Sequence, residues 1–325
     1  MKLIIQIPAL NEADSIGAVL DSLPKTMHGI DDIACVVVDD GSTDDTGALA
    51  EQHGAVVLRH DSPRGVGEAF RTGLARSLQL GADIVATIDA DGQFDPADIA
   101  KLVEPIIKDQ ADFVSASRFK DPALTPDMPY AKHWGNRVIA RWLSRMTGRE
   151  FFDVSCGMRA YSRPAALRLN PQGGFTYTHE VFLCLAFSGL RIKEIPVSVK
   201  GRKHGDSRVA NNLLRYAWRA ASIILATYRD YRPLAFFGTM AGVFGLPGLV
   251  SLAFLYSHWL LTGAFTPYKY IGFAGGLLCG AALLIYLIGL VAAMLVRLRS
   301  GIEGVALKIG AVEQHLNQRD DRNLS

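Results

Sequence analysis

The chain has 325 residues, 49% of them hydrophobic and 20% charged, and its 34 basic and 32 acidic side chains leave a formal net charge of +2. This near-neutral balance excludes a strongly basic nucleic-acid-binding protein and a highly charged disordered chain, so no nucleic-acid partner is expected. At about 150 residues per domain the length predicts two domains, and the low charged fraction shifts the composition toward that of membrane proteins.

Residues 1–208 alternate short apolar runs with helical patterns. The first apolar run, close to Met1, is too short for a secretory signal and is typical of a strand. The alternation predicts an α/β domain with a mainly parallel sheet and helices on both faces. The predicted strands are Leu3–Ile7, Ile33–Val38, Ala55–Leu58, Ile84–Ile88 and Phe113–Ala116, and the predicted helices lie near residues 14–22, 43–53, 66–80, 96–108, 131–147 and 178–188.

The segment from Lys200 to Arg232 is basic, with eight lysines and arginines against Asp206 and Asp230. From Val209 onward its apolar residues recur at spacings of three and four, which predicts an amphipathic helix over 209–232. Two interpretations stay open for this helix. It lies on the inner leaflet of a membrane, or it is an ordinary surface helix that packs on the first domain.

Two runs without Asp, Glu, Lys or Arg follow, Leu234–Gly263 and Tyr270–Val296. Each exceeds the roughly 20 residues that a helix needs to cross a bilayer. They predict a transmembrane hairpin within 233–299, with spans of about 234–262 and 270–296, and a tail over 300–325. The alternative is a pair of buried helices in a soluble protein.

The flanks of the two spans differ in charge. Arg229 and Arg232 precede the first span and Arg297 and Arg299 follow the second, whereas the connection carries only Lys269. The positive-inside rule therefore predicts a multi-pass protein of the inner (cytoplasmic) membrane, with the 1–208 domain and both termini in the cytoplasm. The cysteines, at positions 35, 156, 184 and 279, lack the paired spacing of a disulfide framework or a zinc site.

Three predicted strand ends carry polar residues, and ligands of parallel sheets bind at that edge. The first end is PALNE at 8–12, the second is DDGSTD at 39–44, and the third is DADGQ at 89–93. In the second, Asp39 and Asp40 fit either simple turn chemistry or a carboxylate that binds the base or ribose of a nucleotide. The RGVGEA turn at 64–69 lacks the third glycine of a dinucleotide-binding fingerprint.

Asp89 and Asp91 are separated by one residue, and Gln93 follows after one more. In an extended chain residues i and i+2 point to the same side, so both carboxylates can face one point. Paired hard oxygen ligands suit Mg²⁺ or Mn²⁺, completed by phosphate oxygens and water. The alternative is an acidic turn whose carboxylates are solvated.

Taken in order, PALNE, VVVDDGSTD, RGVGEA, DADGQ, SRF at 117–119 and DVSCGMRAY at 153–161 resemble the motifs of family 2 glycosyltransferases. Within that family the chain is similar to polyprenyl-phosphate glycosyltransferases of the dolichol-phosphate mannosyltransferase type, over about residues 1–210. A bacterial branch of this group carries two C-terminal spans. The resemblance implies a GT-A catalytic domain over 1–208, an interfacial helix over 209–232 and the membrane hairpin.

The resemblance also implies a role for each matching residue. Arg202 and Ser207 match the family's RxxGxS loop, and Arg208 keeps the charge where the family often has lysine. Arg137 matches less well, because the segment 120–140 departs from the pattern; for any one of the arginines a solvated basic face is the alternative. The nucleotide-sugar residues implied are Pro8, Ala9, Glu12, Asp40, Asp89, Ala90, Asp91 and Arg202; those for the acceptor phosphate are Arg118, Arg137 and Ser207; the metal ligands are Asp89, Asp91 and Gln93.

The reaction that the resemblance implies is inverting transfer of a sugar from a nucleotide diphosphate donor, GDP-mannose or a UDP-hexose, to a polyprenyl phosphate, undecaprenyl or dolichyl, with Mg²⁺ or Mn²⁺. The lipid phosphate is already mostly anionic, so a strong general base is not required. The resemblance implies that Asp91 is the metal-binding catalytic carboxylate. Asp153 is predicted nearest the attacking oxygen, with Glu180 as its rival. In the alternative interpretation Asp153 orients an arginine such as Arg159.

Other functions compete with this one. A membrane-anchored glycosyltransferase that acts on a soluble or glycolipid hydroxyl has the same motifs. A processive polysaccharide synthase carries Q/RxxRW after its catalytic domain, but Arg141-Trp142 has Val138 three residues before it and lies upstream of Asp153. A membrane scaffold without activity is the remaining alternative. Membrane glycosyltransferases of this type self-associate in some cases, and a homo-oligomer is left open here.

Overall fold

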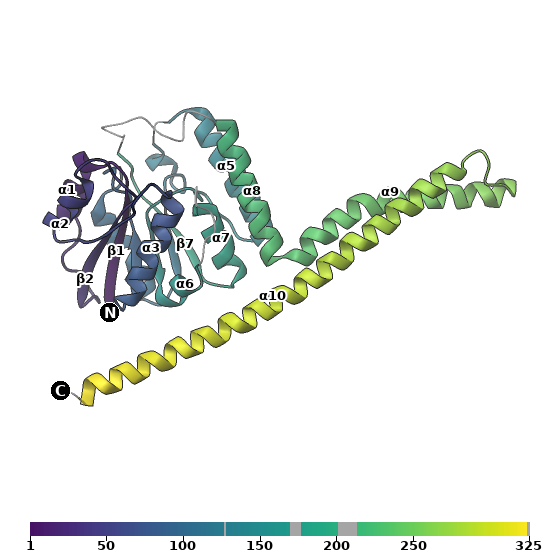
Figure 1. Ribbon diagram of the computed structural model, residues 1–325. Helices are drawn as coiled ribbons and strands as arrows, with labels where there is room; N and C mark the ends of the chain where they lie inside the picture. Colours follow the sequence, from purple (N-terminus) through teal and green to yellow (C-terminus); the bar gives the residue numbers. More distant parts are fainter. Residues whose placement is uncertain (127, 170–176, 201–212, 324–325) are drawn as a thin grey trace. The chain divides into compact units, whose positions relative to one another are not determined.

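The structure of the protein, a computed structural model, describes residues 1–126, 128–169, 177–200 and 213–323 (Figure 1). The chain forms two compact units, Met1–Ile224 and Leu225–Ser325. Within the described residues, seven strands of the N-terminal unit pair in the order β3-β2-β1-β4-β6-β5-β7. The strands are β1 (Lys2–Ala9), β2 (Asp32–Asp39), β3 (Val56–Arg59), β4 (Ile84–Thr87), β5 (Phe113–Ser117), β6 (Arg159–Ser162) and β7 (Ile192–Pro196).

Strand direction decides which loops meet at one edge of the sheet. β1 and β2 pair in parallel from Lys2 opposite Asp32 to Ala9 opposite Asp39, so they end level. The described strands pair in parallel except at β6, which runs antiparallel to β4 and β5. The segment that precedes β6 therefore lies at the same edge as the segments that follow β1, β2, β4 and β5.

Helices cover both faces of this sheet (Figure 1). On one face, inward side chains of β1 such as Leu3 and Ile5 form a buried cluster with residues of α1, α2 and α4. On the other face aromatic rings from α3, β5 and α7 pack together, including Phe113 and Phe182 at 5.2 Å between ring centres. The helices of this unit are α1 (Ala13–Asp21), α2 (Thr46–Gln52), α3 (Val66–Gln79), α4 (Ile99–Ile107), α5 (Tyr130–Thr147), α6 (Arg163–Leu167), α7 (Thr178–Phe187) and most of α8 (Leu213–Tyr231), with short 3-10 turns at Pro96–Asp98 and Pro122–Leu124.

The prediction of a mainly parallel sheet with helices on both faces is confirmed. The helix expected near 43–53 begins only at Thr46, because the Asp44 carboxylate accepts the Thr46 amide (3.1 Å) and holds the preceding residues in a turn. In α8, Ala220 and Ile224 are fully buried whereas Trp218 is 77% exposed. That helix therefore has one buried face, and contact of its other face with a membrane stays a prediction.

In the C-terminal unit α9 (Pro233–Thr262) and α10 (Lys269–Asn323) form an antiparallel hairpin along a seam of small residues. A Cβ atom on Gly248 would lie 2.8 Å from the Cys279 sulfur, and one on Gly275 would lie 2.9 Å from Cβ of Ser251. Small residues that let two helix backbones approach this closely are typical of transmembrane helix pairs.

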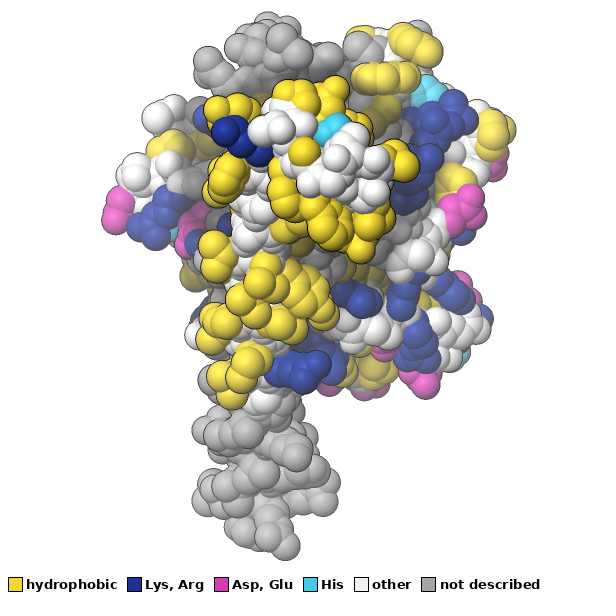
Figure 2. Space-filling model, turned by 90° about the vertical axis from the view of Figure 1, so that its right-hand side faces the viewer, with side chains coloured by type: hydrophobic (Ala, Val, Ile, Leu, Met, Phe, Trp, Pro, Cys, Tyr) yellow, Lys and Arg dark blue, Asp and Glu magenta, His cyan; other side chains and the backbone are white. Residues whose placement is uncertain are grey.

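By length and composition, two helices in the described part of the chain suffice to cross a membrane. The most apolar 18-residue stretch of Pro233–Thr262 has a mean hydropathy of 1.7, and that of Lys269–Leu298 has 2.5. Their outward side chains, such as Leu246 and Leu277, are exposed, and Figure 2 shows hydrophobic side chains gathered over the hairpin. α10 continues as a helix past the predicted span, to Asn323.

Candidate active site

The loops after β1 and β2 are joined by hydrogen bonds at the carboxyl edge of the sheet. Asn11, with a positive φ of 53°, accepts the Thr43 amide on its side-chain oxygen at 2.9 Å. Pro8 and Ala9 are the last two residues of β1, and Glu12 follows in the same loop. These three predicted nucleotide-sugar residues therefore adjoin the DDGSTD loop, as parallel pairing of β1 and β2 requires.

The Asp40 carboxylate is directed at the RGVG turn. Its Oδ1 accepts the Arg64 amide (2.9 Å) and its Oδ2 accepts the Gly65 amide (2.8 Å). His60 Nδ1 lies 2.7 Å from the same carboxylate, and His60 Nε2 lies 3.0 Å from Thr72 Oγ1. Asp40 thus shapes the turn beside the site, and its direct contact with a base or ribose stays a prediction. No sequence pattern pointed to His60.

Asp89, Ala90, Asp91 and Gln93 follow β4 at the same edge. Burial and the neighbouring Asp91 charge raise the pKa of Asp89 to about 6. A divalent cation between the two carboxylates would remove this repulsion, so the donor set fits Mg²⁺ or Mn²⁺. The Gln93 side-chain NH2 donates to Asp91 Oδ2 (2.7 Å), so its amide has to turn over before Gln93 becomes a ligand.

The backbone of Gly157 lies directly against the Asp89 carboxylate. A Cβ atom at this position would stand 2.6 Å from Asp89 Oδ1 and 2.7 Å from its Cγ. Any side chain at residue 157 would occupy the space of the carboxylate. The DVSCGMR segment before β6 therefore forms one wall of the predicted metal site.

Arg118, which follows β5 and is partly exposed, forms an ion pair with the buried Asp153. Arg118 Nε donates to Asp153 Oδ2 (2.7 Å), and Nη2 donates to Asp153 Oδ1 (2.9 Å) and to Ser155 Oγ (2.8 Å). The Arg118 charge and these hydrogen bonds outweigh burial and hold the pKa of Asp153 below its usual value. Nη1 of Arg118 makes no hydrogen bond with any described residue, which leaves one edge of the guanidinium open to an anion.

Asp153 is fully buried, which favours its orienting role, but its partner is Arg118 and not Arg159. Arg159 is itself fully buried and donates to the backbone oxygens of Cys156 (2.8 Å) and Thr178 (3.1 Å). It therefore holds the DVSCG loop against the start of α7. Glu180, the rival carboxylate, lies half-buried in the first turn of α7.

Three further predicted residues carry basic or hydroxyl groups. Arg137 is exposed on α5, one turn after His133, whose ring stacks on Phe119 beside Arg118 at 5.0 Å between ring centres. Arg202 and Ser207 lie outside the described residues.

Within the described residues, no group of three or more His, Cys, Asp or Glu side chains is placed to hold a metal ion.

The family model of glycosyl transferase family 2 matches residues 4–169, which include every motif of the carboxyl edge described above. The chain belongs to this family. The expected family and the GT-A type of α/β fold are confirmed. The match ends two residues after α6, so it includes the reversed strand β6 and the loop that carries Asp153.

Similar proteins agree with this membership. The UDP-N-acetylglucosamine–dolichyl-phosphate N-acetylglucosaminyltransferase of Methanococcus voltae is 31% identical over 230 residues, 65% of this chain and 90% of that protein. The polyprenol monophosphomannose synthase of Mycolicibacterium smegmatis is 23% identical over 224 residues, 66% of this chain and 83% of that protein. The solved glucosyl-3-phosphoglycerate synthase of Mycobacterium tuberculosis has the same fold, with a TM-score of 0.56 at 23% identity over 70% of this chain and 79% of that one.

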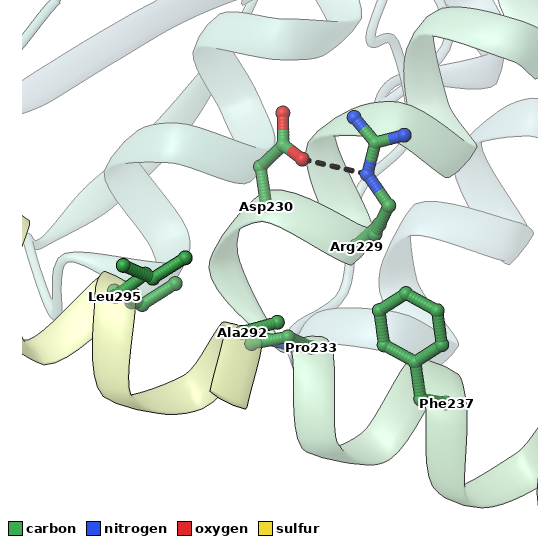
Figure 3. Close-up of a pocket in the computed structure, with 7 residues that line it drawn as sticks. Arg229, Asp230, Pro233, Phe237, Ala292 and Leu295 are labelled. Atoms are coloured by element: carbon green, nitrogen blue, oxygen red, sulfur yellow. Dashed lines mark hydrogen bonds and ion pairs between the residues drawn. The ribbon is translucent and has the colours of Figure 1, made fainter. Parts of the chain in front are cut away.

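The C-terminal unit contains an open cleft of its own, with a volume of about 370 Å³ (Figure 3). Arg229 at its rim donates from Nε to Asp230 Oδ1 at 2.8 Å, and Phe237 and Leu295 lie on its apolar side. A guanidinium above apolar surface suits the head and chain of an amphiphile. The remaining lining residues are Pro233, Ala292 and Val296.

Proposed function

We propose that the protein transfers a sugar from a nucleoside diphosphate to a polyprenyl phosphate, with inversion at the anomeric carbon. The observation that carries this proposal is the Arg118 guanidinium, which Asp153 and Ser155 hold with Nη1 open and whose charge acts on Asp89. The names of two relatives support the acceptor, because one acts on dolichyl phosphate and the other makes polyprenol monophosphomannose. The sugars in those two names differ, so the nucleotide sugar that serves as donor has to be identified by experiment.

The donor side of the proposed site is the edge formed by Pro8, Ala9, Glu12 and the DADGQ turn. Asp89 and Asp91 would hold Mg²⁺ or Mn²⁺, which when bound neutralises negative charge on the diphosphate leaving group. A glucosyl-3-phosphoglycerate synthase with the same fold was solved with Mn²⁺ and UDP-glucose, which supports this assignment. The predicted contributions of Gln93 and Ala90 belong to the same proposal.

The acceptor side of the proposed site needs a cation more than it needs a base. The bond between the anomeric carbon and the diphosphate breaks with its electron pair on the diphosphate, while a phosphate oxygen of the lipid bonds to that carbon. This oxygen is already negatively charged, so no proton has to be removed. Asp153, buried and paired, is suited to fixing Arg118 and not to accepting a proton. Glu180 stays the alternative carboxylate beside the attacking oxygen.

The hairpin of α9 and α10 is proposed to hold the catalytic unit at the membrane, where a polyprenyl phosphate keeps its phosphate at headgroup level. The two apolar helices and their glycine seam support this, as does the cleft that joins Arg229 to an apolar wall. The flanking arginines support a cytoplasmic catalytic unit and cytoplasmic termini.

Transfer of labelled sugar tests the proposal. The full chain in vesicles receives a panel of nucleotide sugars with undecaprenyl or dolichyl phosphate, in Mg²⁺, in Mn²⁺ and in EDTA. We expect a metal-dependent, acid-labile lipid product with one donor. Arg118→Lys keeps the charge but loses the forked pairing with Asp153, so we expect its KM for the lipid to rise on the order of tenfold. Arg163→Lys, which loses a hydrogen bond to the Ala82 oxygen at the opposite edge, is the control. Tight donor binding without any lipid product contradicts the proposed acceptor.

A further inference from the structure

Glu194 on β7 is a buried carboxylate that neither the motifs nor the proposed reaction uses. It is 7% exposed. Its Oε2 accepts the Phe152 amide at 2.9 Å, and its Oε1 accepts the Asp153 amide at 2.7 Å. Two consecutive backbone amides are thus held by the two oxygens of one side chain, which fixes both the position and the tilt of that stretch of backbone.

The residue held in this way is the one that orients Arg118. The Asp153 side chain has only two rotatable bonds, so the position of its backbone limits where the carboxylate that accepts Arg118 Nε and Nη2 can lie. Glu194 also contacts the chain that bears Arg118, because Lys120 Nζ donates to the Glu194 backbone oxygen at 2.6 Å. One residue therefore joins the two segments whose relative placement sets the direction of the guanidinium.

A buried carboxylate that accepts two backbone amides carries a free-energy cost, because its ionised form loses hydration. Burial, with the nearby Asp153 charge, raises the pKa of Glu194 to about 7, so its ionised form is disfavoured in the fold. A glutamine of the same shape removes the charge but accepts only one of the two amides, since its nitrogen is a donor. Only the ionised glutamate accepts both backbone amides, and what it provides over glutamine is accurate placement of Asp153.

We propose that Glu194 is a positioning residue for the acceptor phosphate: through the amides of Phe152 and Asp153 it aims Arg118. This inference rests on the proposed function in one respect only, the identity of the anion that Arg118 meets. Displacements of about 1 Å at a binding group cost on the order of a hundredfold in rate, so the effect is measurable.

The test compares Glu194→Gln with Asp112→Asn in the full chain. Asp112 accepts the Arg191 amide and guanidinium (2.8 Å and 3.0 Å) at the other end of the β5–β7 pair, so it matches Glu194 in chemistry but lies away from Arg118. We expect E194Q to raise the KM for undecaprenyl phosphate roughly tenfold while the Kd of the nucleotide sugar stays unchanged. D112N is expected to change neither constant.

Coupling to Arg118 separates positioning from general stability. In an Arg118→Ala background, E194Q is expected to cause no further loss, because the group it aims is gone. Independent losses that multiply overturn the inference, and so does an E194Q variant whose acceptor KM matches that of D112N. If E194Q does not fold, Glu194→Asp, which reaches only one amide, takes its place.

A readout without activity keeps the inference apart from the proposed function. In ¹⁵N-arginine spectra the Arg118 Nε–H, assigned by its loss in Arg118→Lys, is expected to be protected from exchange in the wild type and exposed in E194Q. If the wild type transfers no sugar to undecaprenyl phosphate but this protection is lost in E194Q, the proposed function fails and the positioning role holds. Unchanged protection in E194Q overturns the positioning role for any acceptor.

Discussion

Gly157 offers a test of the predicted metal site that adds a single methyl group. Its Cβ would stand 2.6 Å from Asp89 Oδ1, whereas ordinary van der Waals contact begins at 3.4 Å. Asp89 Oδ2 would lie nearer still, so in Gly157→Ala the carboxylate must move by about 1 Å to reach ordinary contact distance. The backbone of Gly157 is not in the left-handed region, so alanine adds this contact and no backbone strain.

A shift of this size is expected to lower the rate of catalysis. A displacement near 1 Å at a catalytic group lowers the rate on the order of a hundredfold, and we expect a loss of that order in sugar transfer by Gly157→Ala. The assay is transfer to undecaprenyl phosphate across a Mn²⁺ titration. We also expect the Mn²⁺ concentration for half-maximal rate to rise, since Asp89 is one of the two proposed carboxylate ligands.

Gly135→Ala is the matched control. Gly135 lies within α5 with no atom within 4 Å of an added Cβ, so alanine there is expected to leave transfer unchanged and to stabilise the helix by up to about 1 kcal/mol. Full activity of Gly157→Ala with an unchanged Mn²⁺ requirement would refute the placement of the metal at Asp89.

Three further outcomes are expected. Gly275→Leu forces α9 and α10 apart and is expected to lower the free energy of unfolding of the purified protein by about 1–3 kcal/mol. Gly276→Leu, with open space around its Cβ, is expected to leave it unchanged. Equal melting temperatures of the two variants contradict close packing along the glycine seam. The Glu194 carboxyl, with its pKa raised from 4.5 to about 7, keeps a proton that the unfolded chain releases, so its contribution to the free energy of unfolding falls as pH rises from about 4.5 to 7, by about 3 kcal/mol in all. Unfolding at a series of pH values checks this against Glu194→Gln, in which the fall is absent. Asp40→Asn places an NH2 group against the Arg64 or Gly65 amide and is expected to raise the KM for the nucleotide sugar roughly tenfold, as measured by donor titration. An unchanged KM would mean that the RGVG turn takes no part in donor binding.

The sequence by itself determined the parallel part of the sheet, the family, and the two apolar helices. Each of these depends on signals local in the chain: apolar runs for β1 to β5, ordered motifs at strand ends, and long stretches without charge. For the same reason the carboxyl edge, with Asp89 and Asp91 after β4, was predictable. Parallel strands that follow one another with helices between them bring their carboxyl ends together whatever the packing.

Tertiary structure alone decided how the proposed acceptor side is built. β6 is four residues long and antiparallel, and nothing in its sequence states that direction, yet the reversal brings Asp153 and Gly157 beside Arg118 and Asp89. The pairing of Asp153 with Arg118 and the proposed role of Glu194 depend on contacts across 35 and 41 residues. Such contacts depend on how strands pair in space, and that pairing cannot be predicted from residue type and spacing along the chain.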